Sequence, residues 1–298
     1  MPPRVRPGKR ARQTEENWRP THRRSRHSFS IPEKCKAMTD WTRGDQMFPL
    51  AGKTIVVIGG SRGVGRRIAE SGARQGAQVL AVARHEAALR QLAQDVPGIE
   101  VLALDASRPN APSEVFGALV PDILVLGGGA IPVTAPLHEQ SWRDFTVNWE
   151  SDVRIAFHFC KAALSRPLPV GTSVILIASC AALAGSPLTG GYAGAKRTQM
   201  LIASYSQKES DRLGLGLQFV ALAPGIIPES EFGKLAVDGY ARYIGMSTND
   251  FIRGMASPPT QSDVANAVIE LAVCSDQSKG KMFIVTGEGL ERASLCEW

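Results

Sequence analysis

A tyrosine and a lysine lie four residues apart in the segment YAGAK, at Tyr192 and Lys196, with only alanine and glycine between them. In a helix, residues four apart project from the same face, so the phenol and the ammonium would lie side by side. A free tyrosine has a pKa of about 10, and lowering it to about 7 requires about 4 kcal/mol, to which a close cation in a partly dry site would contribute. The pair predicts an acid–base group, although this spacing also arises by chance on helix surfaces.

Two polar residues upstream strengthen that interpretation. Ser179 ends the apolar run VILIAS, where a hydroxyl at the carboxyl end of a strand would point into a ligand crevice. Asn148 stands in FTVNWES, within an expected helix, and an inward amide there needs hydrogen-bond partners. Taken singly, the two residues would be a strand-end hydroxyl and a buried, satisfied amide.

A glycine-rich segment, GGSRGVG, follows the apolar run 53–59 and precedes a stretch with helical spacing. Glycine lets the backbone approach an anion closely, and a helix N-terminus presents free N–H groups to it. The loop therefore predicts dinucleotide binding, with a plain glycine-rich turn as the alternative, and the absence of GK[ST] argues against a P-loop NTPase. The expected cofactor contacts here are Gly59, Gly60, Ser61, Arg62, Gly63, Val64 and Gly65.

The end of the second apolar run indicates which dinucleotide binds. Sites specific for NAD place a carboxylate there to hold the ribose 2′-OH, whereas this chain has Ala83, Arg84 and His85. With Arg62 in the glycine loop, two guanidinium groups are available for a 2′-phosphate, so NADP(H) is favoured over NAD(H). The alternative is that Arg84 is a solvated residue at a strand end.

Short apolar runs alternate with amphipathic stretches along the chain, which predicts parallel strands covered on both faces. We expect residues 50–290 to form one doubly wound α/β domain, with a parallel sheet flanked by helices on both faces and the ligand at the carboxyl ends of the strands. The expected strands are 53–59, 79–83, 101–105, 123–127, 173–179, 217–223 and 281–287, and the two longest helices are 142–164 and 190–212.

In their order and intervals, these elements resemble the short-chain dehydrogenase/reductase family over about residues 50–290. The resemblance rests on GGSRGVG, Asp105 after the third strand, YAGAK with its upstream Asn148 and Ser179, and APG at 223–225. It implies a Rossmann-like fold and hydride transfer between nicotinamide C4 and a carbonyl or alcohol carbon. The family's catalytic tetrad corresponds to Asn148, Ser179, Tyr192 and Lys196.

The resemblance also implies a role for each residue. Tyr192 would be the general acid in reduction and the base in oxidation. Lys196, together with the positive nicotinamide ring, would lower the pKa of Tyr192. Lys196 would also hold the nicotinamide ribose, while Ser179 would orient the substrate oxygen. Asn148 would anchor a water that relays protons to Lys196. The remaining cofactor contacts would be Asp105 at the adenine and Pro224, Gly225 and Ile227 beside the nicotinamide.

Three positions depart from the family pattern. The first threonine of the glycine loop is replaced by Ile58, and the loop after Gly225 lacks its usual threonine. The tetrapeptide NNAG after the fourth strand reads LGGG at 126–129. Because glycine still permits close backbone approach, Gly127 and Gly128 remain expected cofactor contacts.

The composition divides the 298 residues into two parts. Residues 1–47 carry 12 Lys+Arg and 5 Asp+Glu, whereas 48–298 are close to neutral, so the net charge of +6 says little about partners of the folded part. We expect 1–47 to be a disordered basic extension and 48–298 to be the NADP(H)-binding catalytic domain. The extension could be a solvated tail, sequence upstream of a start at Met38 or Met47, a tail for nucleic acid or anionic membrane, or, least favoured, a targeting segment.

The five cysteines are scattered and form no CxxC, which predicts reduced thiols in a cytoplasmic protein and no metal site. No apolar run reaches the length of a membrane helix, and neither a membrane nor a nucleic-acid partner is expected for the folded domain. Family members are commonly dimers or tetramers built on the two long helices, so a homodimer or homotetramer is expected.

The segment 229–258, between the sixth strand and the next helix, is the variable lid of this architecture. Its apolar side chains predict an apolar or ring-containing carbonyl substrate, or else they only pack the lid onto the domain. Three functions stay open: an NADPH-dependent carbonyl reductase or alcohol dehydrogenase, with 3-oxoacyl-thioester reduction as one possibility; a non-catalytic NADP(H)-binding sensor or interaction protein; and an isomerase or lyase using the same tetrad. The apolar lid residues are Phe232, Leu235, Tyr240, Tyr243, Ile244, Met246, Phe251 and Met255.

Overall fold

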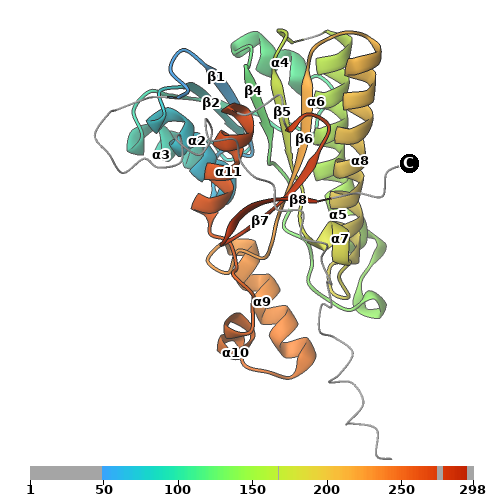
Figure 1. Ribbon diagram of the computed structural model, residues 1–298. Coiled ribbons are helices and arrows are strands. Elements are labelled where there is room, and N and C mark those ends of the chain that lie inside the picture. Colours follow the sequence, from blue (N-terminus) through green and yellow to red (C-terminus); the bar gives the residue numbers. More distant parts are fainter. Residues whose placement is uncertain (1–48, 167, 274–277, 294–298) are drawn as a thin grey trace, which may run out of the picture.

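The computed structural model describes residues 49–166, 168–273 and 278–293, so the predicted extension 1–47 lies outside the described residues. Within them, the strands form a single sheet in the order β3-β2-β1-β4-β5-β6-β7-β8 (Figure 1). Neighbouring strands are parallel from β3 to β7, which confirms the predicted doubly wound α/β fold. The strands are β1 Thr54–Ile58, β2 Gln78–Ala83, β3 Ile99–Ala103, β4 Ile123–Leu126, β5 Ser173–Ile177, β6 Gln218–Pro224, β7 Met282–Thr286 and β8 Gly289–Ala293.

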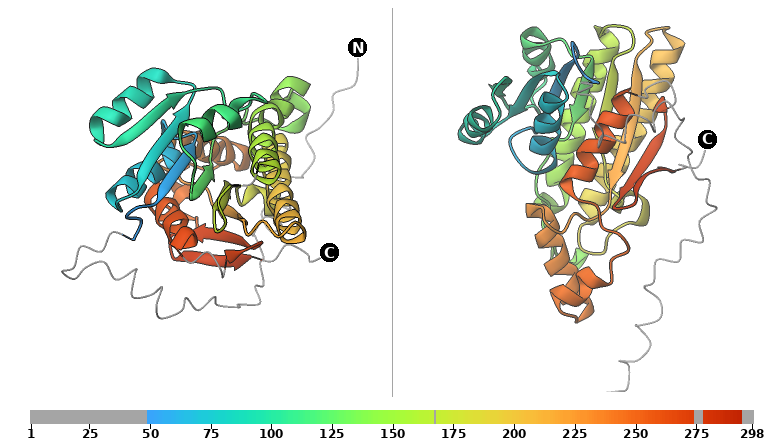
Figure 2. Two further views of the ribbon diagram at one scale, coloured as in Figure 1. Left: turned by 90° about the horizontal axis from the view of Figure 1, so that it is seen from above. Right: turned by 60° about the vertical axis from the view of Figure 1, so that its left-hand side comes forward.

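Helices cover both faces of the sheet, as two views of the molecule show (Figure 2). Because side chains alternate across a strand, each strand contributes to two cores. One core joins the sheet to α4, α6 and α8, and the other joins it to α2, α3 and α11. The helical segments are α2 Gly63–Arg74, α3 Glu86–Asp95, α4 Ala111–Ala118, η1 Leu137–Glu139, α5 Trp142–Asn148, η2 Trp149–Val153, α6 Arg154–Ser165, α7 Ala181–Ala184, α8 Gly190–Arg212, α9 Glu231–Ile244, α10 Thr248–Arg253 and α11 Gln261–Val273.

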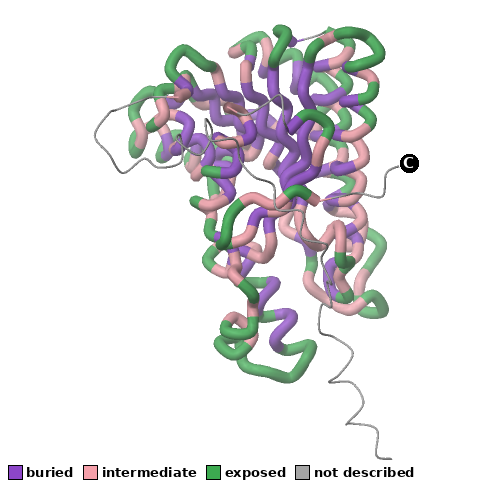
Figure 3. The backbone as a smooth tube through the Cα atoms, in the orientation of Figure 1, coloured by how far each residue is buried: buried purple, intermediate pink, exposed green. Residues whose placement is uncertain are grey.

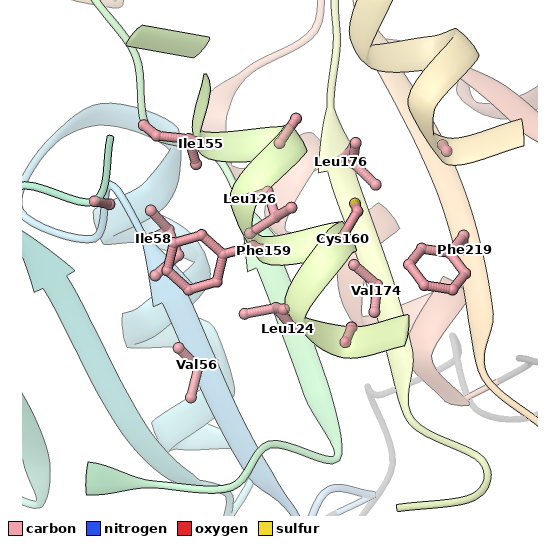
Figure 4. Close-up of a cluster of buried hydrophobic side chains, with 14 of the residues drawn as sticks. Val56, Ile58, Leu124, Leu126, Ile155, Phe159, Cys160, Val174, Leu176 and Phe219 are labelled. Carbon is pink, nitrogen blue, oxygen red and sulfur yellow. The ribbon is translucent and has the colours of Figure 1, made fainter. Parts of the chain in front are cut away.

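Helix α6 illustrates how the sequence specifies this packing. Ile155, Phe159 and Cys160 are buried, and their spacing places them on one helical face. They pack with the strand residues Val56, Ile58, Leu124 and Leu126 (Figure 4). Strands β1, β2, β4, β5, β6 and β7 are buried along most of their length, and exposed residues are concentrated at loops and outer helical faces (Figure 3). Burial on both faces is why the strands are apolar runs rather than alternating patterns.

The structure adds elements that the sequence pattern did not predict. Strand β8 pairs antiparallel with β7 after a two-residue turn, Gly287 and Glu288, so the sheet ends in a hairpin. The expected long helix 142–164 is divided by η2, a π-helical segment. The lid contains two helices, α9 and α10, whose N-caps Ser230 and Ser247 accept hydrogen bonds from the backbone of Gly233 and Asp250.

The sheet order reverses between β2 and β4, on either side of β1. In doubly wound sheets, ligands bind outside the carboxyl ends of the strands at this switch point. The loop after β1, helix α7 after β5 and helix α9 after β6 all begin at that end of the sheet. The fold therefore brings the glycine loop, Ser179 and the lid together.

Candidate active site

A cavity of about 830 Å³ lies at the carboxyl ends of the strands. The glycine loop lines it, together with Ser179, Tyr192 and Lys196. Side chains of α9 and α10, including Phe232, Tyr240 and Phe251, line it from the lid. Two of the residues predicted for the site, Gly60 and Asn148, are not among those that line the cavity.

The glycine loop packs directly against the triple glycine after β4. A Cβ on Gly59 would lie 2.6 Å from Cα of Gly128, and one on Gly65 would lie 2.2 Å from the carbonyl oxygen of Gly59. Gly59 and Gly63 have φ of +87° and +55°, a region that favours glycine. Side chains at these positions would separate the two backbones, so the residues that replace NNAG still permit the close approach.

The first turn of α2 suits an anion. The helix begins at Gly63, its N-cap Arg62 makes no side-chain capping hydrogen bond, and no acidic residue lies in the first turn. Helix N-termini present N–H groups that lack intrahelical partners, and the helix dipole favours negative charge there. These backbone groups line the cavity and fit a pyrophosphate.

Small residues around YAGAK allow α8 to approach α5 and η2 closely. A Cβ on Gly191 would lie 1.9 Å from the carbonyl oxygen of Phe145, and one on Gly194 would lie 3.6 Å from the ring of Trp149. This packing fixes the helix that carries the tyrosine and the lysine. Gly191, just before the motif, is therefore required by the helix packing, whereas a Cβ at Gly194 would make ordinary contact with Trp149.

Ser179, Tyr192 and Lys196 come together as the sequence predicts. Lys196 Nζ lies 5.6 Å from the centroid of the Tyr192 ring, and the Ser179 hydroxyl hydrogen-bonds the phenol. The ring of Phe232 contacts that of Tyr192 edge-on, with centroids 5.1 Å apart and planes inclined at 62°. An acid–base group, a hydrogen-bond donor and an apolar wall thus face one space.

A residue that the sequence analysis did not identify contacts the lysine. Lys196 Nζ lies 3.0 Å from Asp152 Oδ2 and donates to the carbonyl oxygen of Ile177 at 3.0 Å. The lysine and aspartate side chains are only 7% and 2% exposed, so the ion pair lies in the interior. One indication of this contact is present in the sequence. Asp152 lies four residues after Asn148 in a stretch expected to be helical, so the two would share a helix face.

Asn148 reaches the lysine only through Asp152. Its Nδ2 donates to the carbonyl oxygen of Ala130 at 2.8 Å and to Asp152 Oδ1 at 3.1 Å. The role expected for Asn148, anchoring a water beside Lys196, stays a prediction, because the contact shown is with the carboxylate.

The pKa of Tyr192 lies above its ordinary value. Although the residue as a whole keeps some exposure to the cavity, burial of its phenol is the largest effect and raises the pKa. Lys196 and the hydrogen bond with Ser179 lower it in part, while Asp152 and Cys180 raise it further. In this structure desolvation outweighs the ammonium, and the expected drop toward 7, which also relied on the positive nicotinamide ring, stays a prediction.

Lys196 remains a cation in this environment. Burial by itself would lower the pKa of the ammonium, but the Asp152 carboxylate and the Tyr192 phenol oppose it, and the pKa lies above its ordinary value. Two of the three N–H groups of the ammonium have protein partners, which leaves one for a ligand in the cavity.

The residues predicted to contact the adenosine half of the cofactor line the cavity just after β2 and β3. Asp105 Oδ1 accepts from the backbone and hydroxyl of Ser107, and that hydrogen bond is the main cause of a lowered Asp105 pKa, to which Arg84 contributes. Arg62 Nη1 forms an ion pair at 2.7 Å with Glu231 at the start of α9. The two arginines thus lie on the cavity wall where a 2′-phosphate is expected.

Comparison with known proteins supports this interpretation of the geometry. The family described as short chain dehydrogenase matches residues 53–238, more than half of the chain. The chain belongs to the short-chain dehydrogenase family. Membership accounts for the joint presence of the glycine loop, the strand-end serine and YAGAK on a single sheet.

Similar proteins carry reductase names. Human L-xylulose reductase is 28% identical over 135 residues, which are 44% of this chain and 55% of that protein. A short chain dehydrogenase of Pseudocercospora fijiensis is 31% identical over 197 residues, 62% of each chain. A hydroxynaphthalene reductase of Aspergillus fumigatus is 32% identical over 183 residues, 54% of this chain and 63% of that protein. The chain thus spans about half to two thirds of the length of these relatives.

The described residues contain neither a membrane-spanning helix nor a metal-binding cluster. No helix there is both long enough and apolar enough to cross a bilayer. No group of three or more His, Cys, Asp or Glu side chains in the same residues could hold a metal ion.

Proposed function

We propose that this chain is an NADP(H)-dependent oxidoreductase that interconverts a carbonyl and an alcohol. The observation that carries the proposal is that Tyr192, Ser179 and Lys196 line the same cavity as the glycine loop. The short-chain dehydrogenase family and the reductase names of its relatives support the same reaction class.

Each residue would have a separate role in carbonyl reduction. The nicotinamide supplies or accepts a hydride when bound. Ser179 would hydrogen-bond the carbonyl oxygen, and the Tyr192 phenol would donate its proton to that oxygen. Lys196 would stabilise the resulting phenolate, and its remaining N–H would hold the cofactor ribose. Pro224, Gly225 and Ile227, which line the cavity after β6, would flank the nicotinamide.

A preference for NADP(H) is part of the proposal. Arg62 and Arg84 line the cavity, and the end of β2 carries Ala83, Arg84 and His85 with no carboxylate for a ribose 2′-OH. Guanidinium groups bind a phosphate by charge-assisted hydrogen bonds.

We also propose an apolar, ring-bearing substrate. The lid side of the cavity presents Phe232 against Tyr192, and the rings of Tyr240 and Phe251 stack with centroids 6.0 Å apart. Aromatic walls favour flat apolar ligands, and the name of the similar hydroxynaphthalene reductase is consistent with such a substrate.

One observation favours a second candidate function, a non-catalytic NADP(H) sensor. The Asp152 carboxylate pairs with the Lys196 ammonium, and the Tyr192 pKa is raised rather than lowered. A site with these properties would bind the dinucleotide and transfer no hydride.

Assembly and location complete the proposal. Phe157 on α6 and Tyr205 on α8 are 50% and 57% exposed, and Trp142 on α5 is 77% exposed. Because α6 and α8 pack against each other, these exposed aromatic side chains suit a homodimer or homotetramer built on these helices. A cytoplasmic location stays an expectation from the scattered cysteines.

A spectrophotometric assay tests the proposed function. Oxidation of NADPH and of NADH is followed at 340 nm across a panel of aryl, cyclic, sugar and thioester ketones, with the wild type and Tyr192→Phe. We expect faster turnover of aryl or cyclic ketones with NADPH and a loss of at least about 100-fold in kcat for Tyr192→Phe, because the proton donor is removed. Binding of NADPH with no turnover of any ketone would favour the sensor, and activity that survives Tyr192→Phe would reject the phenol as the acid.

A further inference from the structure

Asp152 is a charged residue in the core of the site with no place in the reaction steps above. The residue is 1% exposed, and one carboxylate oxygen lies 3.0 Å from Lys196 Nζ. The other oxygen accepts from Ser151 Oγ at 2.6 Å, Asn148 Nδ2 at 3.1 Å and the backbone N–H of Ala130 at 3.1 Å. Three donors therefore satisfy one carboxylate oxygen, and the Lys196 ammonium pairs with the other.

The surrounding backbone leaves space for this carboxylate and little else. A Cβ on Gly129 would lie 2.5 Å from both oxygens of Asp152, closer than any side chain could approach. The π-helical segment Trp149–Val153 places the aspartate between this glycine and Lys196. The absence of a side chain at Gly129 and the π-helical segment together fix the Asp152 carboxylate beside Lys196.

The phenol of Tyr192 experiences both charges of the pair. Lys196, on the same helix, favours the phenolate, and Asp152, on η2, opposes it. After β5, the polar neighbours are Ser179, which hydrogen-bonds the phenol, and Cys180. From α9 the facing side chain is the uncharged ring of Phe232. The ammonium is thus the cation nearest the phenol in these contacts, and its field is partly cancelled.

We propose that Asp152 is a positioning residue that anchors Lys196 and offsets its charge, so that the Tyr192 phenol stays protonated through neutral and mildly alkaline pH. The inference rests on the proposed function only for its kinetic consequence, that Tyr192 remains a proton donor for carbonyl reduction at alkaline pH. The raised pKa of Tyr192, caused first by burial and increased by Asp152, agrees with this geometry.

The first test needs neither cofactor nor substrate. Tyrosine labelled with ¹³C at Cζ reports phenol ionisation by NMR, and Tyr192→Phe assigns one signal among the four tyrosines of the chain. We expect the wild-type Tyr192 signal to remain that of a phenol at about pH 9, close to the value at which free tyrosine begins to ionise. In Asp152→Asn the midpoint moves to lower pH. A wild-type Tyr192 already ionised at pH 9, or a midpoint in Asp152→Asn that is unchanged or higher, would overturn the inference.

A matched control comes from α8, the helix that carries Tyr192 and Lys196. Asp211, near the end of α8, pairs with Lys279 at 2.6 Å but is 51% exposed. Asp211→Asn removes an aspartate from an aspartate–lysine pair far along the chain from Tyr192, and we expect no change in the Tyr192 titration. If Asp152→Asn does not fold, Asp152→Ser, which also removes the carboxylate but keeps a hydrogen-bonding side chain, replaces it, and the same outcomes decide.

The second test is kinetic. In the pH profile of kcat/KM for carbonyl reduction, we expect the alkaline limb of Asp152→Asn to move to lower pH, so that its activity at pH 9 relative to pH 7 is at least about threefold below the wild-type ratio. A purely structural role would lower both values and leave the ratio unchanged. If the protein reduces no carbonyl but shows the expected titrations, the proposed function is rejected and the inference about Asp152 stands.

Discussion

Two ion pairs connect separate segments around the cavity, and they have similar lengths in different surroundings. Lys196 and Asp152 approach to 3.0 Å with 7% and 2% of their side chains exposed. Arg62 and Glu231 approach to 2.7 Å with 51% and 59% exposed. The comparison shows that burial, rather than distance, determines what an ion pair does, because water and salt screen the second pair and barely reach the first.

The buried pair cannot lose one member without consequence. An unpaired charge in the interior is costly, whereas an exposed charge is solvated when its partner is removed. The interior pair therefore couples stability, the position of Lys196 and the protonation of Tyr192. The exposed pair joins the glycine loop to the lid and can exchange partners when a ligand binds.

The largest expected effect is on stability. Lys196→Met leaves the Asp152 carboxylate buried without its cation, and we expect the free energy of unfolding to fall by about 3–5 kcal/mol. Urea unfolding measures it, with Lys279→Met as the control for loss of an exposed lysine. Adding Asp152→Asn to Lys196→Met should restore more than half of the loss, since no buried charge remains. A loss below 1 kcal/mol in the single variant would contradict burial as the deciding factor.

The next effect concerns cofactor choice at the exposed rim. Arg84→Ala removes a guanidinium expected to hold the 2′-phosphate, and we expect the Kd for NADPH to rise about 10- to 100-fold, as for loss of a hydrogen bond to a charged group. The Kd for NADH should change less than about twofold. Fluorescence titration of both cofactors measures this, and equal losses for the two would assign Arg84 no role in the preference.

The smallest effect should come from the exposed ion pair itself. Glu231→Gln is expected to change the free energy of unfolding by less than about 1 kcal/mol, and the difference should vanish at high salt. Because the change frees Arg62, NADPH should bind slightly more tightly at low salt. Unfolding and binding measured at two salt concentrations test this, and a salt-independent loss of several kcal/mol would show that the two ion pairs are alike.

The fold and three of the site residues followed from the sequence because their signals are local. Strands buried on both faces read as apolar runs, and the glycine loop, Ser179 and YAGAK stand at the ends or starts of such elements. Their meeting at one edge of the sheet is then a consequence of parallel topology. These properties need no knowledge of side-chain packing.

The rest depends on tertiary contacts. Asp152 looks like an ordinary helical residue until η2 and Gly129 place its carboxylate beside Lys196. The sign of the Tyr192 pKa shift could not be predicted either, because it depends on how deeply the phenol is desolvated. Strand β8 contains two adjacent charged residues, Glu291 and Arg292, so it lacks the apolar run by which the other strands were predicted.

A crystal structure with NADP⁺ and a ring-bearing ketone inhibitor tests the central claim most directly. We predict that the ketone oxygen lies within hydrogen-bond distance of both Ser179 Oγ and Tyr192 Oη, that the pyrophosphate lies on the first turn of α2, and that the contact between Lys196 and Asp152 persists. A ketone bound away from Tyr192, or a Lys196 that leaves Asp152 for the solvent when the cofactor binds, would contradict the account.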